Sequence, residues 1–191
     1  MPSQEAVDLL WAMRGHHWTS NLFAPANALQ VGTTPPTWNT THVGWEFANA
    51  PVADESVQCV FELPYNWTEG RPVQLGIRWF LTVAGAGGED VVWQFEYRLA
   101  SEGDIFPAGF TTGSSTIDVS SYLVRELHSV DLIAISGATI SGEYIGCMVD
   151  AKITRLTSAA ADDHESPVIL KGVTLRHTID ALGAWGASTK W

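Results

Sequence analysis

The stretch VQLGIRWFLTV, residues 73–83, decides the fold class. Its apolar residues recur at every second position from Val73 to Val83, and the positions between them are polar or glycine except for Phe80. A second stretch, VVWQFEYRL at residues 91–99, alternates in the same way and places Trp93 on its apolar face. Successive side chains of a strand point to opposite faces, so each stretch is predicted to be a strand with one buried face. Such strands are typical of antiparallel sheets.

The glycine-rich segment between the two stretches predicts that they pair as a hairpin. If Val83 pairs with Val91, Trp79 lies opposite Phe95 and Arg78 opposite Glu96. This register combines an apolar pair on one face with an opposite-charge pair on the other, and both kinds of pair stabilise a sheet.

Similar alternation predicts further strands at residues 57–63, 132–136, 144–156 and 168–179. Many short strands without intervening helices indicate two packed antiparallel sheets rather than a mixed α/β fold. We therefore predict an all-β protein whose residues 50–191 form an antiparallel β-sandwich of the jelly-roll type.

Residues 1–49 are predicted to form an N-terminal arm. Gln4 to Arg14 has apolar residues at helical spacing, which predicts a short helix. From His16 to Asn49 the pattern is lost among prolines and glycines, yet aromatic residues continue, so we expect an extended segment that lies on its own sandwich or on a partner. Four aromatic residues of the arm are the predicted partner-binding residues: Trp11, Trp18, Phe23 and Trp38.

Composition narrows the classes of function. With 21 acidic and 10 basic residues, the chain has a formal charge of −11, which opposes binding to a phosphate backbone. No apolar run approaches the roughly 20 residues that span a bilayer, and no secretory signal is recognisable, so we expect no membrane partner and no export by that route. The two cysteines, Cys59 and Cys147, lie among alternating apolar residues and are expected to be buried free thiols.

Candidate chemical sites are few. The segment Asp162-Asp163-His164-Glu165 has ligands for a divalent cation but not the spacing of a calcium loop, so a solvated loop is the prediction. His16-His17 and His177 are expected to be structural. A glycosidase-like pair of Glu96 with Glu62 or Asp104 stays open, because distant strands can bring two carboxyl groups together. No nucleophile motif is found, and we predict no catalytic site, metal or cofactor.

Several segments resemble small virion proteins of tailed bacteriophages. The resemblance rests on residues 61–67 (FELPYNW), 75–80, 91–97, 103–104, 153–155 and 170–177, with Asp180 and Gly183. It implies a jelly-roll-like sandwich, usually a homotrimer, on the outside of a phage head or tail. The leading expectation is a capsid decoration or cement protein made in the host bacterial cytoplasm and bound to the major capsid protein or another virion protein.

Two alternatives accompany that expectation. One is a head-fibre or tail structural protein. The other belongs to a different class, a carbohydrate-binding module of lectin type, since jelly rolls also present aromatic side chains that stack on sugar rings. Several tryptophans fall outside the predicted strands and are free for such a role: Trp38, Trp45, Trp67, Trp185 and Trp191.

Overall fold

A computed structural model describes residues 17–49, 53–64, 67–68, 70–100, 104–137, 140 and 147–180. The predicted helix at residues 4–14, Trp11 and His16 lie outside the described residues. These described residues form eleven strands and one short 3₁₀ helix, which follow one another in this order: β1 His17–Pro25, η1 Ala26–Ala28, β2 Gln30–Val31, β3 Thr37–Asn39, β4 Gly44–Phe47, β5 Ser56–Glu62, β6 Val73–Leu81, β7 Asp90–Ala100, β8 Thr111–Asp118, β9 His128–Ile135, β10 Met148–Arg155 and β11 Val168–Asp180. Within the described residues, no helix is long and apolar enough to cross a bilayer.

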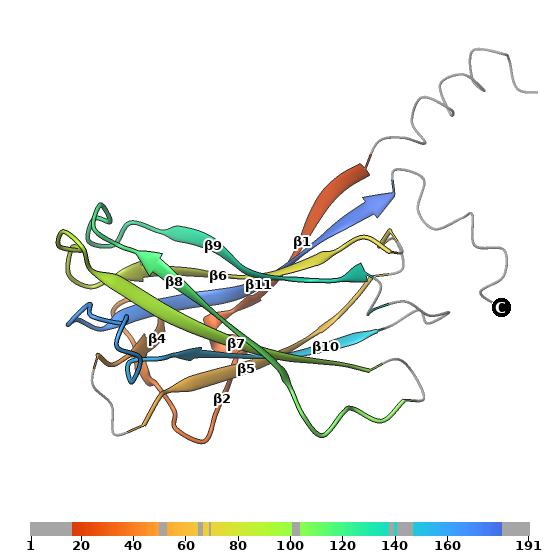
Figure 1. Ribbon diagram of the computed structural model, residues 1–191, viewed down its shortest axis with the longest axis horizontal. Coiled ribbons are helices and arrows are strands. Elements are labelled where there is room, and N and C mark those ends of the chain that lie inside the picture. Colours follow the sequence, from red (N-terminus) through yellow and green to blue (C-terminus); the bar gives the residue numbers. More distant parts are fainter. Residues whose placement is uncertain are drawn as a thin grey trace, which may run out of the picture.

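The strands form two antiparallel sheets that pack face to face (Figure 1). The first sheet has the order β3-β4-β11-β6-β9, with β1 also paired to β11, and the second has the order β2-β5-β10-β7-β8. The pairs β7/β8, β6/β9, β5/β10 and β4/β11 are nested along the chain and alternate between the sheets. This is the winding of a jelly roll, so the predicted all-β sandwich is confirmed.

The predicted hairpin between β6 and β7 is wrong, because these strands belong to opposite sheets. Arg78 lies opposite Gly172 and Ser129, and Glu96 lies opposite Lys152. Alternation shows that each strand has one buried face, but it does not show whether two such faces lie side by side or meet across a core. Here they meet across the core, and the neighbours of β7 are β8 and β10.

The predicted separation of residues 1–49 from the sandwich also fails for the described part of that segment. Strand β11 is long enough to carry two strands in succession on one edge: β4 pairs with residues 168–170 and β1 with residues 172–180. Strand β2 extends the second sheet at β5. The predicted domain boundary at residue 50 would therefore cut through a single sandwich, whose described strands run from residue 17 to residue 180.

One glycine allows β1 to pass so close to β11. A Cβ atom at Gly172 would lie 2.5 Å from the Ala24 carbonyl oxygen and from the Phe23 ring. Any other residue would push β1 away, because real Cβ atoms do not approach other atoms so closely. In the sequence, Gly172 interrupts the last predicted strand, and a glycine inside a strand indicates that another backbone passes close by. The sequence did not show that this backbone is β1.

The core lies between the sheets and is rich in aromatic residues. Trp79 and Trp93 are fully buried, and Phe47 packs edge to face on Trp93 with ring centroids 5.2 Å apart. Cys59 and Cys147 are both buried, and no disulfide joins them, as predicted. Burial raises the pKa of Cys59 to about 12, so the thiol stays protonated and behaves as a small apolar side chain.

Candidate binding surface at the loop end

Four connections meet at one end of the sandwich, on the left in Figure 1. They join β4 to β5 (residues 48–55), β6 to β7 (82–89), β8 to β9 (119–127) and β10 to β11 (156–167). We call this region the loop end; residues 50–52 lie outside the described chain. Loops that a rigid scaffold holds together are the usual place for binding residues.

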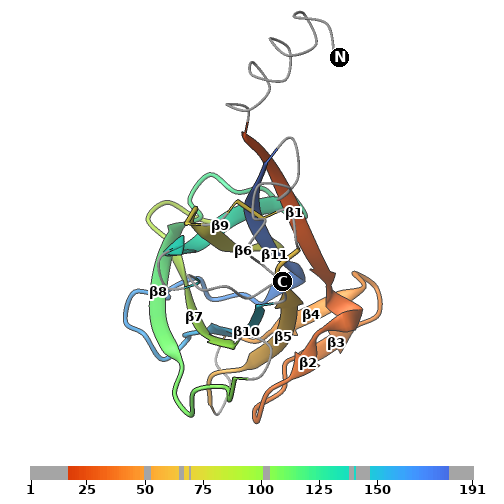
Figure 2. The ribbon, with the colours of Figure 1, turned by 90° about the vertical axis from the view of Figure 1, so that its right-hand side faces the viewer.

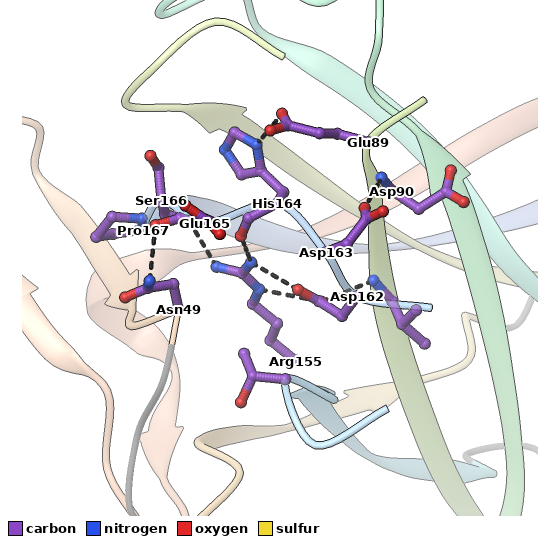
Figure 3. Close-up of polar contacts among 12 residues, drawn as sticks. Asn49, Glu89, Asp90, Arg155, Asp162, Asp163, His164, Glu165, Ser166 and Pro167 are labelled. Atoms are coloured by element: carbon purple, nitrogen blue, oxygen red, sulfur yellow. Dashed lines mark hydrogen bonds and ion pairs between the residues drawn. The ribbon is translucent and has the colours of Figure 1, made fainter. Parts of the chain in front are cut away.

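Arg155, the last residue of β10, anchors the loop end from inside (Figure 3). Its side chain is 1% exposed and so is that of its partner Asp162. The guanidinium donates from Nε to Asp162 Oδ2 at 3.1 Å and from Nη2 to Oδ1 at 2.7 Å. It also donates to the carbonyl oxygens of His164 and Ser166, at 2.7 and 2.8 Å. Burial of a charge is tolerated when the charge is paired with an opposite charge and hydrogen-bonded. The Arg155 guanidinium meets both conditions.

The same acidic segment is tied to the two neighbouring loops. His164 is buried, and its Nδ1 lies 2.8 Å from Glu89 Oε2. The carboxylate of Asp163 accepts the Asp90 backbone N–H at 2.6 Å, and Asn49 donates to the Glu165 carbonyl at 2.6 Å (Figure 3). The pKa of Glu89 is lowered, first by the N–H of Ala86 and then by His164. These contacts join the β10–β11 connection to the β4–β5 and β6–β7 connections.

The prediction of a solvated loop at residues 162–165 is therefore only half right. Asp163 and Glu165 are exposed, but Asp162 and His164 point inward. The Asp162 carboxylate neutralises Arg155, whereas His164 accepts from Arg155 through its carbonyl oxygen and directs its ring to Glu89. No spacing rule relates these residues in the sequence. In the described part of the chain, no group of three or more His, Cys, Asp or Glu side chains is arranged to hold a metal ion.

Four apolar side chains stand exposed on this rigid support: Val83, Leu123, Val124 and Leu127, with exposed fractions of 47–65%. We call them the apolar patch. They come from two loops that are joined by backbone hydrogen bonds, from Gly85 N to Tyr122 O at 3.1 Å and from Arg125 N to Leu81 O at 3.0 Å. Sequence reasoning missed the patch. Its signal was the pair Leu123-Val124 in a segment too irregular for a strand.

The same end carries a large excess of acidic over basic residues. Nine lie in the four loops or in the strand residues that border them: Asp54, Glu55, Glu89, Asp90, Asp118, Glu126, Asp162, Asp163 and Glu165. Only two basic residues, Arg125 and the buried Arg155, lie in the same stretches, so the net formal charge there is −7. The other described residues include seven acidic and six basic residues, a net formal charge of only −1.

The predicted partner-binding residues that the structure describes do not belong to the loop end. Trp18 and Phe23 belong to β1. Phe23 is 45% exposed, and the Arg78 guanidinium lies over its ring, 5.1 Å from the centroid of the Phe23 ring. Trp38 is half-buried in β3 and packs edge to face on Trp45, with centroids 5.0 Å apart. The structure does not bring Phe23 and Trp38 together into one surface, and Trp11 is outside the described residues.

The other candidate residues have structural surroundings. His177 is buried on the inner face of β11, and burial lowers its pKa. The carboxylate of Glu96 forms an ion pair with Lys152 at 2.7 Å, on the outer face of the second sheet. Glu62 lies at the end of β5 on that face, beyond β10, and Asp104 follows β7. No contact joins Glu96 to either of them among the described residues.

Comparison with known proteins identifies no relatives in sequence. No protein-family model matches the chain, and no curated protein matches it. One similar solved structure is the CBM36-1 domain of a multidomain xylanase from the hindgut metagenome of Trinervitermes trinervoides, with a TM-score of 0.39 and 8% identity over 82% of this chain and 96% of that domain.

Two further similar structures are parts of larger proteins. The Arthrobacter globiformis T6 isomalto-dextranase complexed with panose has a TM-score of 0.38 and 14% identity over 82% of this chain and 23% of the enzyme. Dimeric latent PorU from Porphyromonas gingivalis has a TM-score of 0.37 and 12% identity over 86% of this chain and 13% of that protein. Similarity at this level does not assign a function to the chain.

Proposed function

We propose that the protein is a non-enzymatic structural component of a virus particle, of the capsid-decorating type, and that it attaches through its loop end. The observation that carries the proposal is a group of four exposed apolar side chains on two loops that backbone hydrogen bonds join to each other. Contiguous apolar patches mark interaction sites, and a surface that is already ordered loses little entropy on binding.

The chemistry of the loop end also describes its partner. Leucine and valine side chains favour an apolar counterpart, and the net formal charge of −7 around them favours a surface with lysine or arginine at its rim. Within this proposal the partner is the major capsid protein or another virion protein with such a surface. A head fibre or a tail component would use the same contact on another part of the particle.

Reconstitution on particles tests this proposal. The wild-type protein should be present at a fixed number of copies in a mass-spectrometric inventory of purified particles. The double substitution Leu123→Ser and Leu127→Ser should lower that occupancy sharply, because it removes apolar area from the contact. The control is Val60→Ser, which changes a half-exposed valine (50%) on β5, away from the loop end.

Two results would contradict the proposal. One is an inventory of particles that lacks the protein altogether. The other is normal occupancy by the folded double variant, which would move the docking surface away from the loop end.

A second function is favoured by a different observation, on the outer face of the second sheet. There Asp150 accepts hydrogen bonds from Gln58 at 2.8 Å and from Arg98 at 2.7 Å. The Arg98 guanidinium lies 5.1 Å from the ring centroid of Phe106 and 4.6 Å from that of Phe110. Fixed polar groups beside aromatic rings are the elements of a sugar-binding face. A glycan array with the isolated protein separates the functions: only a lectin binds without particles.

A further inference from the structure

The two sheets differ in how their edge strands are protected. Strand β8, Thr111–Asp118, forms one edge of the second sheet and pairs along its whole length with β7. Residues 111–117 (TTGSSTI) contain no charge and no proline. Among the described residues, no backbone hydrogen bond joins residues 111–117 to an element other than β7. The outer backbone groups of β8 are therefore available to another strand.

The other edges carry features that oppose strand addition. Strands β2 and β3 have only two and three residues. Strand β9 has a register shift beside Leu132, and its Asp131 is held by Arg176 at 2.7 Å. Strand β1 ends at Pro25, which lacks a backbone donor. Short strands, bulges, inserted charges and prolines are the usual protection of sheet edges, and residues 111–117 have none of them.

We propose that β8 is a self-association edge, at which a second copy of this chain pairs antiparallel about a twofold axis through Ser114. The two second sheets then form one continuous sheet of ten strands. This inference stands apart from the proposed function, because it rests on the edge strand and not on the loop end.

The residues of β8 complement themselves in this register. Ser114 faces Ser114 of the second copy, Thr112 faces Thr116, and Thr111 faces Ile117. Serine and threonine hydroxyls pair favourably across strands, and no like charges are brought together. Gly113 is required inside each copy, because a Cβ atom there would overlap the Phe95 ring. Packing against Phe95 within one copy thus explains why residue 113 is glycine. The presence of this glycine does not argue against pairing between two copies.

The charge distribution favours this edge over other modes of self-association. A second copy at the loop end would bring together two regions with a net formal charge of −7 each. Antiparallel pairing at β8 instead directs the two loop ends away from each other, since β8 runs toward the loop end in each copy (Figure 1). Figure 2 shows the fold from the opposite end. The apolar patch of each copy then stays uncovered.

Sedimentation tests the inference. The wild-type chain at high micromolar concentration should have twice the 20.7 kDa mass of one chain. Ser114→Lys should be a monomer under the same conditions, because it places two like charges opposite each other at the twofold axis. Gln94→Lys is the matched control and should remain a dimer, since Gln94 lies opposite Ser114 but on the inner strand β7. Thr116→Lys is the second edge variant, should Ser114→Lys fail to fold.

A cross-link tests the register. Ser114→Cys should form a disulfide-linked dimer under oxidising conditions, because the Cβ atoms of directly opposite residues lie about 4.5–5.5 Å apart. Thr112→Cys should not form this disulfide, because residue 112 of one copy lies opposite residue 116 of the other. Cys59 and Cys147 are buried and do not interfere.

Three outcomes overturn the inference. The first is a wild-type chain that is monomeric at every concentration or has three times the mass of one chain. The second is a folded edge variant with lysine at position 114 or 116 that still dimerises. The third is cross-linking through Thr112→Cys in place of Ser114→Cys, which shows that the strands do not pair as proposed.

Discussion

Trp79 and Trp93 meet edge to face across the core, with ring centroids 5.6 Å apart, although they lie on consecutive strands of opposite sheets. Both side chains are fully buried. Trp79 also contacts the pair formed by Tyr122 and His128, whose rings stack 3.5 Å apart beneath the loop end. The same aromatic cluster thus holds the two sheets together and supports the loops at one end.

Trp93 should be one of the most sensitive residues of the core. Trp93→Ala removes a fully buried ring that packs on Phe47 and Trp79, so the free energy of unfolding should fall by about 3–5 kcal/mol. Urea denaturation followed by circular dichroism measures this loss. Trp38→Ala is the control and should cost less, because Trp38 is only half-buried. Equal losses for the two variants would show that the core is not centred on Trp93.

The ion pair of Arg155 should stabilise the loop end chiefly by avoiding an unpaired buried charge. Arg155→Met leaves Asp162 without its cation and should lower the free energy of unfolding by roughly 3–5 kcal/mol. Adding Asp162→Asn should restore part of that loss. A double-mutant cycle from denaturation curves gives the coupling between the two residues. Additive losses would mean that the two side chains do not act as a pair.

Stability should fall as the pH decreases below the ordinary titration range of histidine. Burial lowers the pKa of both His128 and His177 in the folded protein, so the unfolded chain binds protons more readily. Their contribution to stability is therefore present above the unfolded pKa, near 6.5, and is lost as the pH falls through the folded pKa. Melting temperatures measured between neutral and mildly acidic pH should show this loss. His177→Gln should reduce the slope, and an unchanged slope would exclude His177 as its cause.

Truncation of the N-terminal segment should have two distinct outcomes. Deleting residues 1–16 leaves every described strand in place, so the sandwich should fold. Deleting residues 1–40 removes β1, β2 and β3 and uncovers the edge of β11 along residues 172–180, so stability should fall sharply. Thermal melts of both proteins measure the difference. A fully stable protein lacking residues 1–40 would show that β1 is dispensable for the sandwich.

Attachment to particles should weaken as salt rises if the loop end docks on a basic surface. Exposed charges are screened within about 8 Å at physiological ionic strength, so long-range attraction is lost first and the association rate should fall. Binding kinetics measured over a series of sodium chloride concentrations give this dependence. Attachment that strengthens with salt would instead indicate a contact dominated by the apolar patch.

The strands with one buried face could be predicted from the sequence. Alternation located β5, β6, β7, β9, β10 and β11 to within a few residues. It did not locate β8, because an edge strand of threonine, serine and glycine buries too little apolar area to alternate. It also missed the four strands before residue 48, of which β2, β3 and β4 have only two to four residues, too few to show a period. The loop end could not be predicted either, since its residues come from connections that are distant in the chain.

By itself the sequence determined that the protein is all β, that its thiols are buried and that its charge is strongly negative. These properties depend on the periodicity and composition of single segments. Only the tertiary structure decided that β6 and β7 face each other across the core, that Arg155 is neutralised by Asp162 inside the loop end, and that a net formal charge of −7, out of −11 for the chain, lies there. The physical reason is that pairing, burial of a charge and the local density of charge are relations between segments. They come to exist when the winding of the jelly roll brings four separate loops to one end.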